Sequence, residues 1–231
     1  MNKITIAIDG FSSTGKSTVA KQLAKHLDYI YVDSGAMYRA ITWFAIQNKF
    51  INASHFNVEG LVSQLHNVNI SFVFNKDLGF AEVYLNGINV EKEIRTMEVS
   101  SFVSQVSTVP EVRYQLVKQQ QQFGKGKGIV MDGRDIGTVV FPEAELKIFL
   151  TASAETRAKR RFNELKARGD KVSYDDVLHN VQERDYIDSH RADSPLVKAS
   201  DAIEIDNSNL TLEAQFDKIL KMVTMTLESN E

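Results

Sequence analysis

A glycine-rich segment close to the start of the chain has the residue types that bind phosphate groups. Residues 10–17 read GFSSTGKS and match the spacing GxxxxGK followed by Ser or Thr. A β-branched run at residues 4–8 predicts a strand before it, and apolar residues at helical spacing predict a helix over residues 17–27. In that context, loop amides and the helix N-terminus face the phosphates. Lys16 is then expected at the β- and γ-phosphates and the Ser17 hydroxyl on magnesium.

A second polar segment follows the next expected strand, residues 29–32. Ser34 and Arg39 come after the carboxyl end of that strand, where ligands of α/β proteins bind. We expect Ser34 to cap a helix over residues 36–46, with Arg39 at least one turn into it. A plain helix cap followed by a surface arginine is the alternative interpretation.

A basic segment near the middle of the chain is the third candidate. At 3.6 residues per turn, Arg157, Arg160, Arg161 and Arg168 share one face of the helix expected from Ser153. A solvated helix face is the usual meaning of such a charge run. Downstream of a phosphate loop, however, arginines also suit a phosphoryl group in transfer, because they donate in a plane and in pairs.

Asp132 ends an apolar run at residues 129–132 and has the position of a Walker B carboxylate. We expect it to order the water shell of magnesium. A surface aspartate that merely ends a strand is the alternative interpretation.

The elements that must position these residues predict an α/β fold. Strands alternate with helices at a spacing typical of a parallel sheet with right-handed crossovers. Further strands are expected at residues 129–132, 146–150 and 202–205, and further helices at residues 110–123, from Ser153 onward, 174–186 and 210–227. The sequence thus predicts a P-loop parallel sheet flanked by helices, with a short helical lid.

In the segment between the two halves of this fold, apolar residues recur with a period of two, as in a β-strand. Apolar residues alternate over 70–74 and 81–85, and Asn86-Gly87 then predicts a hairpin because both turn residues take positive φ. We therefore expect a small antiparallel insertion in the monophosphate-binding region. The predicted organisation is a kinase core at residues 1–60 and 106–231, a lid at about 157–170 and an inserted subdomain at 61–105.

Composition excludes several classes of protein. The 231 residues carry a formal net charge of −3, so a nucleic-acid binder driven by its field is disfavoured. The chain has no cysteine, which excludes disulfides, thiolate nucleophiles and cysteine zinc sites. No run is long enough for a membrane span, and the first residues lack the features of a signal peptide. A cytoplasmic location is the default expectation.

Among P-loop proteins, three classes compete. A GTPase switch needs DxxG after a strand, and no DxxG occurs in this chain. A motor or transporter is usually larger, and no segment for coupling to a partner is evident. A small-molecule kinase needs a second anion site and a basic lid, which the two segments above supply.

Five blocks of sequence resemble the bacterial cytidylate (CMP) kinase family. They are DSGAMYRA at 33–40, SQVSTVPEVR at 104–113, DGRDIGTVVFP at 132–142, RAKRRFNELKARG at 157–169 and ERDYIDSHRADSPL at 183–196. The blocks occur in the family's order and span essentially the whole chain. Phe11 departs from the family, which usually has proline there, and we expect little consequence.

The resemblance implies a role for each matching residue. The donor ATP is bound by Gly10, Phe11, Ser12, Ser13, Thr14, Gly15, Lys16, Ser17 and Thr18. Cytosine or its near surroundings are read by Ser34, Ser104, Arg113 and Asp135. The acceptor phosphate is held by Arg39, Arg134 and Arg191, and the ribose by Arg184 and Asp188. The catalytic set is Lys16 with the lid arginines Arg157, Arg160 and Arg161.

The expected reaction is phosphorylation of CMP or dCMP by ATP with magnesium, giving CDP or dCDP, by a monomer without nucleic-acid or membrane partners. A kinase of UMP or AMP is the first alternative, and a P-loop regulatory switch is the second.

Overall fold

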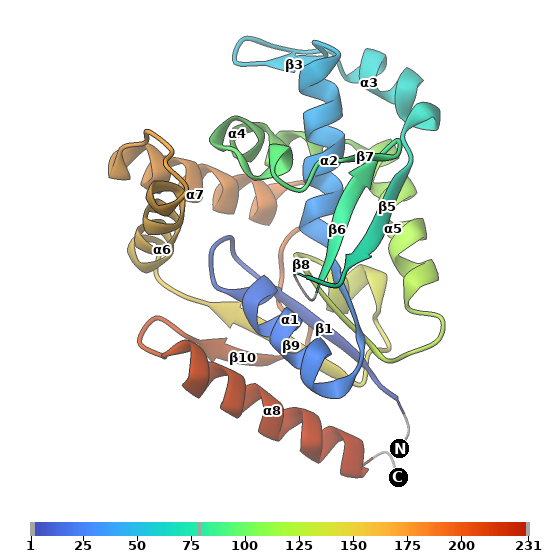
Figure 1. Cartoon of the computed structure of the whole chain (residues 1–231), viewed down its shortest axis with the longest axis vertical. Helices are drawn as coiled ribbons and strands as arrows, with labels where there is room; N and C mark the ends of the chain where they lie inside the picture. The colour runs from blue at the N-terminus through green and yellow to red at the C-terminus, as the bar shows by residue number, and fades with distance from the viewer. Residues whose placement is uncertain (1–2, 78–79, 230–231) are drawn as a thin grey trace. The chain divides into compact units, whose positions relative to one another are not determined.

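The computed structural model describes residues 3–77 and 80–229. The chain divides into two compact units: Met1–Val32 with Phe123–Glu231 form the first, and Asp33–Gln122 form the second (Figure 1). The expected insertion, residues 61–105, falls inside the second unit, and its residues 78 and 79 lie outside the described part. The division into core, insertion and lid stays a prediction.

The first unit contains a five-stranded sheet with the strand order β10-β9-β1-β8-β2. Its strands are β1 (Thr5–Gly10), β2 (Ile30–Asp33), β8 (Ile129–Gly133), β9 (Leu146–Thr151) and β10 (Ile203–Asp206). The central strand β1 pairs in parallel with β8 and β9, and β10 pairs in parallel with β9. The predicted α/β fold with a parallel sheet is therefore confirmed.

Four helices and one π-helical turn complete the first unit. They are α1 (Lys16–Leu27), the turn η3 (Ile136–Val140), α6 (Ala154–Ala167), α7 (Tyr174–His190) and α8 (Leu212–Ser229). Ser153 caps α6 as predicted, because its side-chain oxygen accepts a hydrogen bond of 3.2 Å from the Thr156 amide. Helix α7 extends one turn beyond the predicted end at residue 186.

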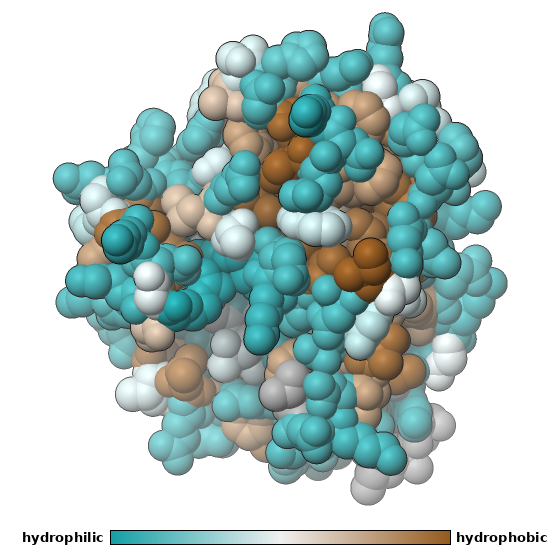
Figure 2. Space-filling model, turned by 45° about the horizontal axis from the view of Figure 1, so that its top comes forward, coloured by the Kyte–Doolittle hydropathy of each residue, from teal (hydrophilic) through white to brown (hydrophobic). Residues whose placement is uncertain are grey.

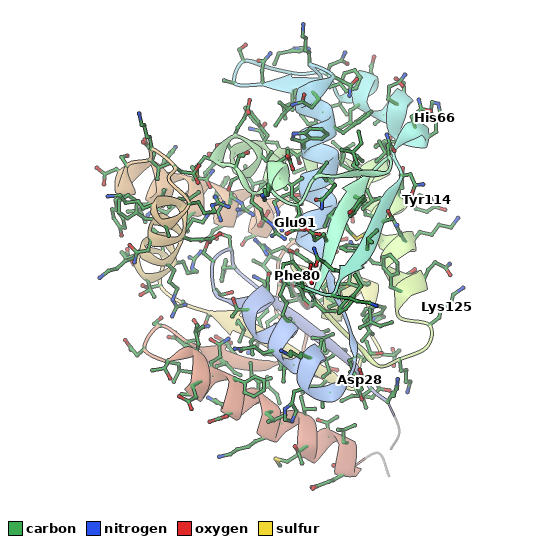
Figure 3. All side chains as sticks on the ribbon, viewed as in Figure 1. Asp28, His66, Phe80, Glu91, Tyr114 and Lys125 are labelled. Carbon is green, nitrogen blue, oxygen red and sulfur yellow. The ribbon has the colours of Figure 1, made fainter. Side chains whose placement is uncertain are left out.

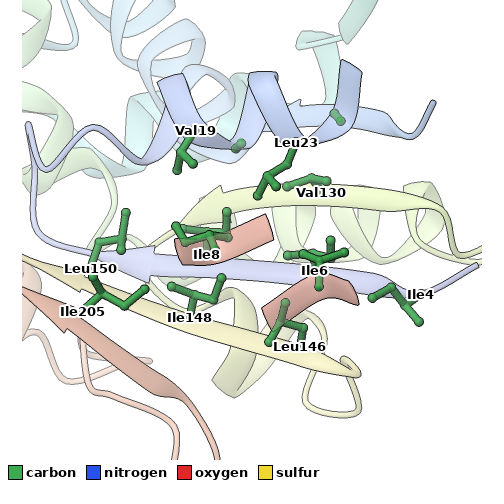
Figure 4. Packing of buried hydrophobic residues seen from close by; sticks show 14 residues of the cluster. Ile4, Ile6, Ile8, Val19, Leu23, Val130, Leu146, Ile148, Leu150 and Ile205 are labelled. Carbon is green, nitrogen blue, oxygen red and sulfur yellow. The ribbon is translucent and has the colours of Figure 1, made fainter. Parts of the chain in front are cut away.

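The core of the first unit lies against one face of β1. Ile4, Ile6 and Ile8 alternate along the chain, so all three point to this face, where Val19 and Leu23 of α1 pack on them (Figure 4). Each fully buried side chain of this size stabilises the fold by about 1.5–3 kcal/mol. This packing fixes the carboxyl end of β1 and the first turn of α1, between which residues 10–15 run.

The second unit combines helices with two small antiparallel sheets. Its helices are α2 (Ser34–Gln47), α3 (Val58–Gln64), α4 (Met97–Val106) and α5 (Pro110–Phe123), with 3-10 turns at η1 (Leu65–Asn67) and η2 (Glu93–Arg95). Its strands are β3 (Ile51–Asn52), β4 (His55–Phe56), β5 (Ile70–Asn75), β6 (Phe80–Leu85) and β7 (Ile88–Asn89). Asn86 and Gly87 have φ of 51° and 81° between β6 and β7, so the predicted small antiparallel sheet and its hairpin turn are confirmed.

The expectation that Ser34 caps α2 is wrong. The helix begins at Ser34 itself, and Asp33 is the cap, because its Oδ1 accepts a hydrogen bond of 2.8 Å from the Ala36 amide. A carboxylate at this position also suits the positive end of the helix dipole better than a neutral hydroxyl. The sequence analysis does not predict helices α3 and α4. It also does not predict the strands β3 and β4, because two-residue strands show no periodicity.

The surface carries no single dominant apolar area in the view of Figure 2, where hydrophilic side chains separate the brown groups. Among the helices that the structure describes, none is both long and apolar enough to cross a membrane.

Candidate functional site

The loop between β1 and α1 is held in a shape that other residues could not adopt. Gly10 has φ of 140°, and a Cβ atom there would lie 2.0 Å from the Leu150 carbonyl oxygen on the neighbouring strand β9. Ser13 and Gly15 also have positive φ, at 58° and 85°. The loop is thus tightly curved, and it delivers the chain to the amino end of α1, where free amides and the helix dipole attract anions.

Lys16 lies within this loop. Its Nζ donates to the Phe11 carbonyl at 2.6 Å and to the Thr14 hydroxyl at 3.4 Å. Burial lowers the pKa of this ammonium well below its usual range, and the charge of Arg134 lowers it further, against the opposing effect of Asp132. The lysine side chain is therefore buried within the loop, where the motif predicts a group that binds phosphate oxygens.

An oxygen-lined position occurs beside the first turn of α1. The Ser17 hydroxyl donates to Asp132 Oδ2 at 2.9 Å, and the Tyr31 hydroxyl donates to Asp132 Oδ1 at 2.8 Å. A hydroxyl and a carboxylate are hard ligands that suit Mg²⁺, which keeps several waters and needs few protein ligands. No group of three or more His, Cys, Asp or Glu side chains that could hold a metal occurs in the described part of the chain. This donor set fits hydrated magnesium.

Five of the predicted acceptor residues gather in the first unit. Arg134 Nε donates to Asp188 Oδ2 at 2.8 Å, and Arg191 Nη2 lies 3.6 Å from Asp135 Oδ1. Burial raises the pKa of the Asp188 carboxyl, but the charges of Arg134, Arg184 and Arg191 outweigh it, so the net shift is downward. The arrangement keeps three guanidinium groups and two carboxylates together, which suits a ligand with both anionic and hydrogen-bonding groups.

Asp9, near the carboxyl end of strand β1, holds a segment next to this cluster. Its two carboxylate oxygens accept hydrogen bonds from the Ile136 and Gly137 amides, at 2.8 and 2.7 Å. Burial raises its pKa to about 6 despite these two bonds. The carboxylate therefore fixes the segment that directly follows Arg134 and Asp135. Sequence reasoning missed it, although it stands immediately before the phosphate-binding motif.

The three arginines predicted for the lid have separate partners. Arg157 is buried, pairs with both oxygens of Asp185 at 3.0 and 2.6 Å, and lies 5.2 Å from the centre of the Phe11 ring. Arg160 donates to the side chain and the carbonyl of Asn207 at 2.9 and 2.8 Å. Arg161 donates to Glu164, one turn along the same helix, at 2.8 Å. The shared helix face of these arginines thus leads to three different contacts.

Phe11, where the resembling family usually has proline, takes part in this packing. Its ring meets Phe149 edge-on, with 6.2 Å between ring centres, and the Arg157 guanidinium lies over it. A phenylalanine at this loop position is therefore accommodated by an aromatic neighbour and a cation.

In the second unit, a buried carboxylate forms ion pairs with two arginines. Asp33 Oδ2 lies 2.9 Å from Arg39 Nη2 and 3.0 Å from Arg95 Nη2. Burial opposes its ionisation, but the charges of Arg39 and Arg95 hold the pKa of this carboxyl well below its usual range. Glu91, labelled in Figure 3, accepts from Arg95 Nε and Nη2 at 3.1 and 2.8 Å. Arg39 is thus brought together with Arg95, which sequence reasoning did not single out.

Of the three predicted base-reading residues in the second unit, Ser34 begins α2, Ser104 lies on α4 and Arg113 lies on α5. Arg113 is 2% exposed, and its Nη1 donates to the Tyr38 hydroxyl at 3.4 Å. Ser104 is also buried, and its carbonyl accepts from the Ser107 hydroxyl at 2.7 Å. A buried guanidinium costs free energy unless it is paired, and the Tyr38 hydroxyl accepts one hydrogen bond from Arg113.

Comparison with known proteins agrees with these features. The family model described as cytidylate kinase matches residues 6–225. The chain is 70% identical to the cytidylate kinase of Flavobacterium johnsoniae over 223 residues, which cover 96% of this chain and 97% of that protein. It is 56% identical to the cytidylate kinase of Bacteroides thetaiotaomicron, covering 96% of this chain and 100% of that protein. An uncharacterised protein from Eubacterium ventriosum shares the fold, with a TM-score of 0.50 at 14% identity over 97% and 99% of the two chains.

Proposed function

Because this chain belongs to the cytidylate kinase family, we propose that it transfers the γ-phosphoryl group of ATP to CMP, giving ADP and CDP. An oxygen of the CMP phosphate forms the new bond to the γ-phosphorus, while the bond from that phosphorus to the β–γ bridging oxygen breaks. We propose the same reaction for dCMP. The observation that carries the proposal is a phosphate loop with a buried lysine in the same unit as a cluster of arginines and carboxylates.

The donor side works by positioning and charge, and it needs no protein nucleophile. The loop amides orient the ATP phosphates, and Lys16 neutralises the negative charge on the β- and γ-phosphates. The donor residues are Gly10, Phe11, Ser12, Ser13, Thr14, Gly15, Lys16, Ser17 and Thr18.

We propose that Ser17 holds magnesium directly and that Asp132 orders its water shell, since the Ser17 hydroxyl already touches Asp132. Bound there, the ion supplies neutralisation of phosphate charge. Tyr31 donates to the other oxygen of Asp132 and so keeps the carboxylate oriented.

The acceptor residues are those that the sequence resemblance implies. We propose that the CMP phosphate is bound by Arg39, Arg134 and Arg191, the ribose by Arg184 and Asp188, and the base region by Ser34, Ser104, Arg113 and Asp135. The buried ion pairs around Asp33 and Asp188 support this, because they orient guanidinium groups.

Among the lid arginines, Arg161 is expected to act on the developing charge. Replacing Arg161 with alanine lowers kcat about tenfold and raises the KM for CMP less, because an arginine that engages only the transition state contributes nothing to ground-state binding. Steady-state kinetics at saturating ATP measure both constants. Lys159→Ala, which removes an exposed charge from the same helix, is the matched control. A change in thermal stability alone would instead indicate a solvated helix face.

Three further proposals come from the sequence. Residues 61–105 form the inserted subdomain for the monophosphate, the enzyme is a monomer, and it works in the cytoplasm.

A panel of nucleoside monophosphates tests the proposed function. With ATP and magnesium, the purified protein should phosphorylate CMP and dCMP much faster than UMP or AMP. Preference for UMP or AMP would assign a different monophosphate kinase. Binding of nucleoside triphosphate without phosphoryl transfer to any acceptor would indicate a regulatory switch.

A further inference from the structure

Asn207 joins three segments of the first unit through its side chain. Its Nδ2 donates to the Thr14 carbonyl of the phosphate loop at 2.5 Å and to Gln215 Oε1 of α8 at 2.7 Å. Its Oδ1 accepts from Arg160 Nη1 of α6 at 2.9 Å. The residue is fully buried and directly follows β10, at the carboxyl edge of the sheet.

These contacts fix which way the carboxamide points. Arg160 is only a donor, so it requires the oxygen of the carboxamide on its side, and both hydrogens of Nδ2 are then directed to Thr14 and Gln215. Arg160 also donates to the Asn207 carbonyl at 2.8 Å, and the Asn207 amide donates to Thr151 at 2.9 Å. Hydrogen bonds therefore hold both the side-chain carboxamide and the backbone of Asn207.

The contact with Thr14 bears on the peptide that joins Thr14 to Gly15. A trans peptide is planar, so holding its carbonyl on one side directs the Gly15 N–H to the other. Ser13 and Gly15, the residues on either side of Thr14, both have positive φ. Because glycine is conformationally permissive, Gly15 gives the orientation of this peptide little intrinsic preference. Without an anchor on the carbonyl, the direction of that amide is poorly determined.

We propose that Asn207 is a positioning residue for the ATP-binding loop, which it acts on by fixing the Thr14–Gly15 peptide and not by touching the nucleotide. This proposal rests on the proposed function, because it assumes that the loop binds the ATP phosphates. It assigns a role in donor binding to a residue that lies 193 positions along the chain from the loop it controls.

Asn207→Asp tests the proposal with a nearly isosteric change. Aspartate keeps the acceptor for Arg160 but replaces the donor to Thr14 and Gln215 with an oxygen, which repels the Thr14 carbonyl. We expect the Kd for ATP, measured by calorimetry without CMP, to rise about tenfold, as loss of one well-formed hydrogen bond predicts. The KM for CMP should stay within about twofold, a split that a general loss of stability would not produce.

Ser208→Ala is the matched control, because Ser208 bonds to Asp206 and Ser153 in the same loop and has no bond to Thr14 among its described contacts. It should leave the Kd for ATP unchanged. Asn207→Ala serves if the aspartate variant fails to fold, since it removes the donor without adding charge, and the same split is expected.

The ATP-binding measurements distinguish failure of the proposed function from failure of the positioning role of Asn207. If wild-type protein does not bind ATP, the proposed function itself fails. If wild type binds ATP and the Asn207 variants bind it equally well, or lose ATP and CMP affinity by the same factor, the positioning role is wrong.

Discussion

Replacing Lys16 with alanine lowers kcat by about 10³-fold, the scale expected when a preorganised cation at the transferring phosphates is removed. The fold should survive the change. The Phe11 carbonyl that accepts from Lys16 also accepts from the Thr14 hydroxyl, at 3.0 Å, so this carbonyl keeps a donor. Removing a buried cation also removes its desolvation cost. Initial rates with CMP at saturating ATP, together with thermal unfolding, measure the two effects.

Lys25→Ala is the matched control, because Lys25 lies on the same helix and is exposed. It should retain wild-type turnover. Near-normal turnover of Lys16→Ala would falsify the assignment of residues 10–17 as the donor phosphate loop.

Substitution of Asp135 is expected to change how strongly the enzyme prefers cytosine over uracil. Cytosine presents an amino donor at N4, where uracil presents an acceptor at O4. In its proposed role as a base reader, the Asp135 carboxylate accepts from the N4 amino group and repels O4, so mispairing costs about 1–3 kcal/mol. Asp135→Asn offers a donor as well as an acceptor. The CMP/UMP ratio of kcat/KM should therefore narrow by about 5- to 150-fold.

The CMP/UMP ratio of kcat/KM distinguishes base reading by Asp135 from its contact with Arg191. Asp135 lies 3.6 Å from Arg191, so any substitution also disturbs a guanidinium proposed for the acceptor phosphate. That disturbance lowers activity with CMP and UMP alike, because both carry the same phosphate. A fixed ratio with a common loss would show that Asp135 acts through Arg191 alone. Asp135→Ala, which offers neither donor nor acceptor, gives the intermediate ratio.

The elements with strong periodicity were predictable from sequence. The alternating isoleucines of β1, the helical spacing of α1 and the Asn86-Gly87 turn each depend on neighbours in the chain, and all three are confirmed. The cap of α2 was assigned to Ser34 and belongs to Asp33, because two adjacent residues both have capping side chains and only the backbone decides between them.

Contacts between distant residues were beyond the sequence. The lid arginines were recognised as one face of a helix, but their partners Asp185 and Asn207 are 28 and 47 residues away from Arg157 and Arg160. Asp9 has the same character, since it reaches amides 127 and 128 residues further on. A local pattern identifies which residues are available for chemistry, whereas tertiary packing decides which residues orient them.

The position of β1 in its sheet has a consequence for synthesis of the chain. Both strands that flank it, β8 and β9, lie beyond the second unit, and Thr5 pairs with Ile129, 124 residues later. At roughly 5–20 residues per second, β1 waits roughly 6–25 s on the ribosome before β8 is made. During that time an apolar strand has neither edge paired, while the second unit is one continuous stretch that can be completed first. The phosphate loop, although encoded almost first, is among the last features that the sheet can fix in place.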